Sequence, residues 1–90
     1  MIIISYDIKS DKLRTKFAKR LEELGARRLQ YSVFEALNSS RVLDNLRFVI
    51  REEFASKFCM DDSVVVFHCE EEKTERYGNA DQRTGNLLFF

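Results

Sequence analysis

Two short apolar runs constrain the fold of this chain more than any other feature of its sequence. The first covers Met1 to Tyr6, and the second is SVVVFHC at residues 63–69. Continuous apolar runs of this length are typical of strands that are covered on both faces of a sheet. We therefore expect both segments to be buried strands, with the first one central in its sheet.

Two amphipathic helical patterns lie between these runs. The first follows the capping residues Ser10 and Asp11 and ends at Gly25. Its apolar stripe consists of Leu13, Phe17, Leu21 and Leu24. The second follows Ser39 and Ser40 and is expected to extend to about Phe58. Its stripe consists of Leu43, Leu46, Ile50 and Phe54, flanked by Val42 and Val49.

The region between the helices is ARRLQYSVFEAL, residues 26–37. It is rich in strand-forming residues and contains neither Gly nor Pro, so its local pattern predicts one long strand. If it forms a hairpin instead, the order of elements becomes βαββαβ, which is the ferredoxin-like motif.

Length and composition limit the class of protein. Ninety residues fit a single domain, and 44% hydrophobic with 33% charged residues is typical of a globular chain. No apolar run approaches the ~20 residues that span a bilayer, so we expect no membrane partner. The first residues lack the basic region of a signal peptide, which predicts a cytoplasmic protein. Cys59, Cys69 and the single His68 match no zinc or redox spacing.

Charge is distributed unevenly although the net charge is zero. Residues 1–58 hold 12 Lys and Arg against 8 Asp and Glu, whereas residues 59–90 hold 3 against 7. This asymmetry is compatible with a basic face for nucleic acid. On charge alone, an ordinary solvated helix face is the favoured explanation.

Asp7 is the most informative polar residue because it ends the first apolar run. A carboxylate at the end of a central strand offers the hard oxygen ligand that Mg²⁺ prefers. Alternatively, Asp7 starts the turn into the first helix or pairs with a nearby lysine. One acid is a poor metal site, but a two-fold axis close to Asp7 would bring two copies together.

A second candidate site is the segment RRLQYSVFE, residues 27–35. Its arginines are suited to phosphate, Tyr31 and Phe34 to base stacking, and Ser32 to hydrogen bonding. The alternative is that both aromatic residues belong to the core.

The strand that ends at Asp7 and the segment RRLQYSVFE, taken together with the helix between them, resemble a known family. The apolar strand ending in Tyr-Asp, the basic helix DKLRTKFAKRLEELG and the segment RRLQYSVFE are similar to the small CRISPR-associated protein that partners the spacer integrase, a family known as CRISPR-associated endoribonucleases. The resemblance covers about residues 1–69, which we expect to form the core domain. Residues 70–90 are expected to be a C-terminal extension.

The resemblance implies an α+β, ferredoxin-like homodimer with an additional C-terminal strand. It implies that the middle region breaks near residues 30–32. In such relatives the C-terminal segment adds a strand across the dimer or docks on the integrase subunit, and the apolar character of Leu87 to Phe90 predicts a short added strand of this kind.

The resemblance also assigns roles to individual residues. Asp7 with its symmetry mate would bind Mg²⁺ as the catalytic site, with Tyr6 beside it. The residues expected to bind nucleic acid are Arg14, Lys16, Arg28, Ser32 and Phe34.

Three functions are compatible with this resemblance. The first is an Mg-dependent endonuclease that acts on single-stranded RNA or double-stranded DNA during CRISPR adaptation. The second is a non-catalytic DNA-binding scaffold of the integrase complex. The third is a toxin-type ribonuclease of the virulence-associated protein D type, which shares the fold.

Overall fold

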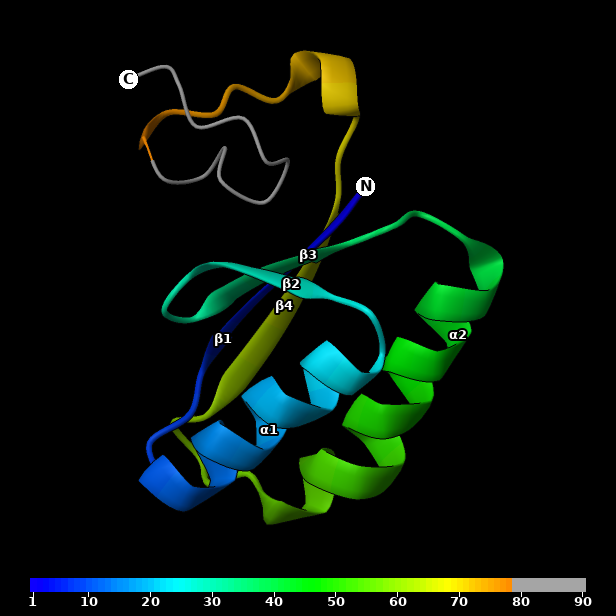
Figure 1. The fold of residues 1–90 in the computed structure, drawn as a ribbon. Coiled ribbons are helices and arrows are strands. Elements are labelled where there is room, and N and C mark those ends of the chain that lie inside the picture. The colour runs from blue at the N-terminus through cyan, green and yellow to red at the C-terminus, as the bar shows by residue number, and fades with distance from the viewer. Residues whose placement is uncertain (79–90) are drawn as a thin grey trace.

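The computed structural model describes residues 1–78. Its main elements are β1 (Ile2–Asp7), α1 (Asp11–Glu23), β2 (Arg27–Gln30), β3 (Val33–Ala36), α2 (Ser40–Phe48) and β4 (Ser63–His68). The strands form one antiparallel four-stranded sheet in the order β2-β3-β1-β4, and α1 and α2 lie side by side on one face of it (Figure 1). This is the βαββαβ arrangement, so the predicted α+β, ferredoxin-like fold class is confirmed.

Helix α1 forms as its periodicity predicts. The side chain of Ser10 accepts the backbone N–H of Leu13 at 3.2 Å and caps the first turn. Leu13, Phe17 and Leu21 of the stripe are buried, Phe17 fully, and Leu24 at the C-cap is half-buried. The helix ends before Gly25, whose φ of +95° lies in the left-handed region that favours glycine.

The middle region is a hairpin, so the prediction of one long strand is wrong. Strands β2 and β3 are separated by Tyr31 and Ser32, and the break implied by the family resemblance is present. A long-range contact holds this turn, since the carbonyl of Ser32 accepts the backbone N–H of Tyr6 at 3.1 Å. Strand propensity acts locally and contains no information about such a contact.

The second helical segment reaches the predicted length but changes its geometry on the way. Helix α2 continues as a π-helix (Val49–Phe54) and a 3₁₀ turn (Ala55–Lys57). The π-helix ends at Phe54, whose ring packs edge-to-face on Phe17 with a centroid separation of 5.0 Å. No helix within residues 1–78 is long and apolar enough to cross a bilayer.

The core lies between the sheet and the two helices. Alternate residues of β1 point into it, namely Ile2, Ile4 and Tyr6, and all of them are buried. Neither α1 nor α2 covers the other side of the sheet, which we call the open face. The strand register assigns to it Ile3, Ser5, Val33, Glu35, Val65 and Phe67.

The prediction that β4 is covered on both sides is therefore wrong for the described part of the chain. Strand β4 is an edge strand, and Val65 and Phe67 on the open face are 46% and 49% exposed. Strand β1 is central, as predicted, but only its helix side is fully covered. The apolar pattern is real, but within residues 1–78 the second side of the sheet is covered only in part, where Arg76 packs on Glu35.

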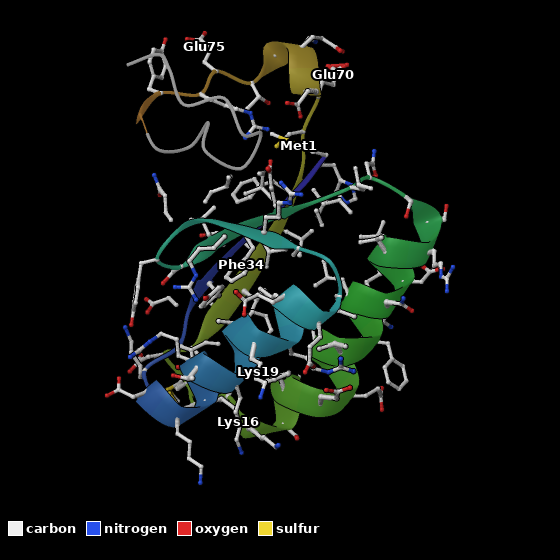
Figure 2. The ribbon with its side chains drawn as sticks, viewed as in Figure 1. Met1, Lys16, Lys19, Phe34, Glu70 and Glu75 are labelled. Atoms are coloured by element: carbon white, nitrogen blue, oxygen red, sulfur yellow. The ribbon has the colours of Figure 1, made fainter. Side chains whose placement is uncertain are left out.

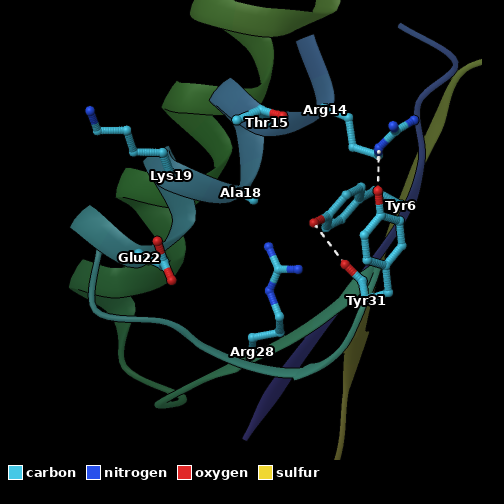
Figure 3. Close-up of a pocket in the computed structure, with 8 residues that line it drawn as sticks. All are labelled: Tyr6, Arg14, Thr15, Ala18, Lys19, Glu22, Arg28 and Tyr31. Carbon is cyan, nitrogen blue, oxygen red and sulfur yellow. Dashed lines mark hydrogen bonds between the residues drawn. The ribbon is translucent and has the colours of Figure 1, made fainter. Parts of the chain in front are cut away.

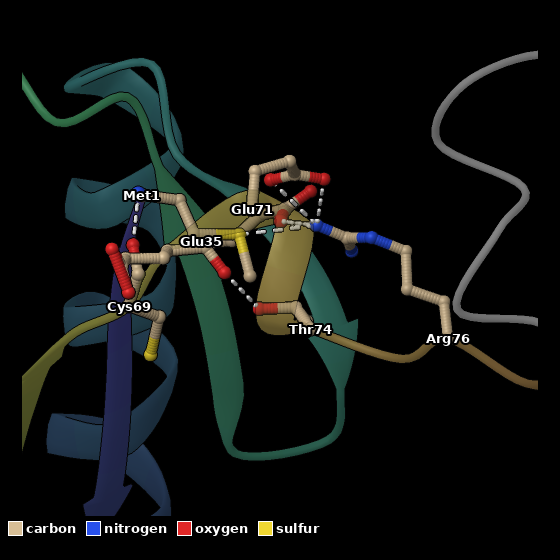
Figure 4. A network of polar contacts seen from close by, with 7 residues as sticks. Met1, Glu35, Cys69, Glu71, Thr74 and Arg76 are labelled. Atoms are coloured by element: carbon tan, nitrogen blue, oxygen red, sulfur yellow. Dashed lines mark hydrogen bonds and ion pairs between the residues drawn. The ribbon is translucent and has the colours of Figure 1, made fainter.

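Residues 70–78 fold against the start of β1 (Figure 4). Nη2 of Arg76 donates to Glu35 at 2.9 Å and to Glu71 at 3.0 Å, and lies 3.1 Å from the sulfur of Met1. The side chains of Arg76 and Glu35 are only 10% and 8% exposed. The predicted terminal strand, Leu87 to Phe90, lies outside the described residues.

Candidate nucleic-acid and metal site

Asp7 is the last residue of β1 and pairs with Ser63 of β4. Strand alternation places its side chain on the side of the open face, where it is 65% exposed. Nζ of Lys9 donates to both carboxylate oxygens, at 3.1 and 3.2 Å, and this hydrogen bond raises the pKa of Lys9. The pairing with a nearby lysine, one of the alternatives for Asp7, is thus present.

A single chain offers little for a metal ion. Within residues 1–78, no group of three or more His, Cys, Asp or Glu side chains is close enough to hold one. Magnesium is commonly held by one or two carboxylates with waters and phosphate oxygens completing the shell. The donor set at Asp7 therefore fits Mg²⁺ only if a second chain contributes another carboxylate and Lys9 moves away.

Tyr6 points to the opposite side of the sheet from Asp7. It is 4% exposed, and its ring packs edge-to-face on Phe17 at 5.0 Å. Its hydroxyl donates to the carbonyl of Tyr31 at 3.4 Å, and burial raises its pKa. The structure therefore does not bring these two predicted catalytic side chains together.

A cleft of about 420 Å³ lies between α1 and the β2–β3 hairpin, and we call it the Tyr31 cleft (Figure 3). It is lined by Tyr6, Arg14, Thr15, Ala18, Lys19, Glu22, Arg28 and Tyr31. Two of the predicted nucleic-acid-binding residues, Arg14 and Arg28, thus meet at one site.

The two arginines have different surroundings. The guanidinium of Arg14 donates to the Tyr31 hydroxyl at 3.1 Å and to the carbonyl of Ile8 at 2.9 Å, and it pairs with Asp11. Its side chain is 23% exposed. These contacts occupy Arg14 and make it a residue that positions Tyr31.

Arg28 contacts aromatic rings instead. Its Cζ lies 5.1 Å from the ring centroid of Phe34 and 5.8 Å from that of Tyr31. No carboxylate within residues 1–78 forms an ion pair with it. Phe34 is fully buried, so it contributes to this site as the surface beneath Arg28.

The remaining predicted residues lie outside the Tyr31 cleft. Lys16 and Lys19 project from α1 (Figure 2). Lys16 is exposed and lines a groove between α1 and the π-helix, which Lys19 and Lys57 also line. Ser32 lies in the hairpin turn, where its backbone contacts Tyr6.

Lys19 and Glu22 were not predicted as cleft residues. A signal was available for Glu22, because residues 14, 18 and 22 recur every four positions and share one side of α1. That side borders the buried stripe, since Ala18 is itself buried.

The fold and this cleft define a ferredoxin-like α+β protein with a basic, aromatic-lined site on the helix side of its sheet. Residues 1–77 match the family described as CRISPR associated protein Cas2, and the chain belongs to that family. Membership implies a role in CRISPR adaptation, and the family is in general one of endoribonucleases.

Proposed function

We propose that this protein is a nucleic-acid-binding homodimer that supports the integration of new spacers together with the CRISPR integrase. Family membership supports the adaptation role. The proposal of a homodimer depends on the open face of the sheet. Its apolar residues Val65 and Phe67 are half exposed, and Asp7 lies at the end of this face.

A second copy of the chain is the occupant we propose for the open face. The apolar runs of β1 and β4 have the pattern of strands covered twice, yet the helices cover them once. A two-fold related copy presents the same apolar residues, and such self-complementary contacts are the commonest in soluble oligomers. Half-exposed Val65 and Phe67 would then become buried.

The dimer is tested by measuring the mass of the protein in solution by sedimentation equilibrium. The wild type is expected to be dimeric and Phe67→Glu monomeric, because a charge would be placed in the apolar contact. Phe48→Glu is the matched control, since Phe48 is 61% exposed on α2, on the helix side. A monomeric wild type, or a dimeric Phe67→Glu, would contradict the proposal.

Phosphate contacts by basic side chains supply the nucleic-acid binding. Lys16 and Lys19 on α1 and Arg28 at the cleft offer cations that hold a backbone without reading its sequence. Affinity for duplex DNA should fall with salt, with a logarithmic slope of about −0.9 for each phosphate contact. Lys16→Glu should weaken binding and reduce spacer acquisition in cells that contain the integrase. A binding constant independent of salt would count against this part of the proposal.

Metal-dependent hydrolysis of phosphodiesters is the second candidate function, favoured by the exposure of Asp7 at the end of the open face. Two Asp7 carboxylates, one from each chain, would hold Mg²⁺. When bound, the ion would polarise the phosphate and activate a water. Lys9 would have to release Asp7 for this to occur, because its ammonium contacts both carboxylate oxygens.

A cleavage assay with and without Mg²⁺, on single-stranded RNA and on duplex DNA, separates the two functions. Asp7→Asn should abolish cleavage and leave spacer acquisition intact if the protein acts as a scaffold in adaptation. Asp61→Asn is the control, an exposed acid close to Lys9 that has no proposed role. Full Mg-dependent cleavage by Asp7→Asn would exclude Asp7 as the metal ligand.

A further inference from the structure

The Tyr31 cleft presents hydrogen-bond donors that have no acidic partner in the described chain. The Arg28 guanidinium lies over the rings of Phe34 and Tyr31. A guanidinium held on aromatic faces keeps its in-plane N–H groups for a planar or tetrahedral anion. Because Phe34 is fully buried, the support beneath Arg28 is rigid.

Two further donors converge on the same space. The Tyr31 oxygen accepts the Nε–H of Arg14 at 3.1 Å, so its own hydrogen is left to donate outwards. Lys19 lines the cleft from α1 and forms no ion pair within residues 1–78. Glu22 is the one carboxylate among the residues that line the cleft.

We propose that the Tyr31 cleft binds the phosphomonoester at the end of a nucleic-acid strand. Such a group carries close to two negative charges at neutral pH and three acceptor oxygens, whereas a phosphodiester carries one charge. The two cations without ion pairs, Arg28 and Lys19, match the dianion. This inference rests on the proposed nucleic-acid binding and specifies which part of the ligand this site recognises.

The shape of the cleft favours the end of a strand, rather than the middle of a duplex, as its ligand. Its lining includes Tyr6 and Ala18, which are only 4% and 6% exposed, so the site is recessed. Backbone phosphates of a duplex lie along a convex surface, and their neighbours on both sides hinder entry into a recess. A terminal phosphate has a neighbour on one side only.

The test compares two short oligothymidylates that are labelled at the 3′ end and differ only in a 5′-phosphate or a 5′-hydroxyl. Fluorescence anisotropy at constant ionic strength measures their binding to the full-length protein. The wild type should bind the phosphorylated strand about tenfold more tightly, as expected for hydrogen bonds to a charged group. Arg28→Gln should remove this preference. Arg41→Gln, which deletes an equal charge on α2 outside the cleft, should retain it.

Two conservative variants distinguish recognition from a folding defect. Tyr31→Phe keeps the ring and removes one donor, and should reduce the preference several-fold. Arg28→Lys keeps the charge but removes the planar, two-pronged donor geometry of the guanidinium, and should also reduce the preference for the phosphorylated strand. Glu22→Gln removes the opposing carboxylate and should increase the preference. Circular dichroism verifies that each variant is folded.

Several results would overturn the inference. If the wild type binds the two strands equally and still binds duplex DNA, the strand-end site is excluded while the proposed nucleic-acid binding is retained. If the wild type binds no nucleic acid, the strand-end site and the proposed nucleic-acid binding are both excluded. Competition by free thymidine 5′-monophosphate as effective as that by the phosphorylated strand would assign the cleft to nucleotides instead. A full preference in Arg28→Gln would exclude Arg28 as its source.

Discussion

Removal of Arg76 should destabilise the whole domain, although this residue lies after the last strand of the sheet. Its guanidinium pairs with Glu35 of β3 at 2.9 Å, and both side chains are about nine-tenths buried. It also pairs with Glu71, whose side chain is 59% exposed. The substitution Arg76→Met keeps most of the aliphatic stem and deletes the charge.

The expected cost follows from the burial of each partner. Breaking a buried pair by removing one member costs about 3–5 kcal/mol, because the other charge stays buried without its partner. The exposed contact with Glu71 adds less than about 1 kcal/mol. The total loss is therefore about 3–5 kcal/mol. That corresponds to a fall of roughly 15–30 °C in the thermal midpoint for a domain of this size.

Urea unfolding followed by circular dichroism measures this cost, at several protein concentrations because dimerisation would stabilise the folded state. Arg47→Met is the control, since its pair with Asp44 is 3.8 Å long and both side chains are at least half exposed. The control should cost less than about 0.5 kcal/mol. Adding Glu35→Gln to Arg76→Met should recover part of the loss. Equal costs for Arg76→Met and Arg47→Met would refute the reasoning.

Three further measurements test other parts of the fold. Gly25→Ala should lower the free energy of unfolding by about 1 kcal/mol because φ is +95° there, and an unchanged midpoint would argue against a left-handed residue. Phe17→Ala should cost about 3–5 kcal/mol by opening a cavity in the core, whereas a loss below about 1 kcal/mol would contradict its full burial. Hydrogen bonding from Arg20 lowers the pKa of Glu53 below its ordinary 4.5. The stabilisation by Glu53 is therefore present above pH 4.5 and lost as the pH falls through the lower folded value, so the thermal midpoints of wild type and Glu53→Gln should converge in acid.

The elements that depend on local periodicity could be predicted from the sequence. Helix α1 is an example, because its cap at Ser10, its four-residue stripe and its terminal Gly25 all act within the helix itself. The same holds for the position of β1 at the centre of the sheet. The hairpin between Gln30 and Val33 could not be predicted in this way, since a hydrogen bond from distant Tyr6 holds its turn. Only the family resemblance indicated it.

The candidate site shows the same limit at the level of side chains. The family resemblance gives Arg14 and Arg28 the same expected role in binding nucleic acid. In the structure, the guanidinium of Arg14 forms hydrogen bonds with Ile8 and Tyr31 and an ion pair with Asp11. The guanidinium of Arg28 instead lies against aromatic rings. Residue type indicates the possible chemistry, but the available donors depend on neighbours that folding supplies.

The topology explains why both helices lie on one side of the sheet. The connections β1–α1–β2 and β3–α2–β4 each join two parallel strands, and they run across the sheet in opposite directions because the two strand pairs are antiparallel to each other. Crossovers of one handedness then place both helices on the same face. Within residues 1–78 the open face therefore keeps Val65 and Phe67 half exposed, and these are the residues that the proposed second copy would cover. In the proposed dimer, Asp7 would bind a metal only together with its copy in the second chain, so Mg-dependent cleavage should decline on dilution as the dimer dissociates.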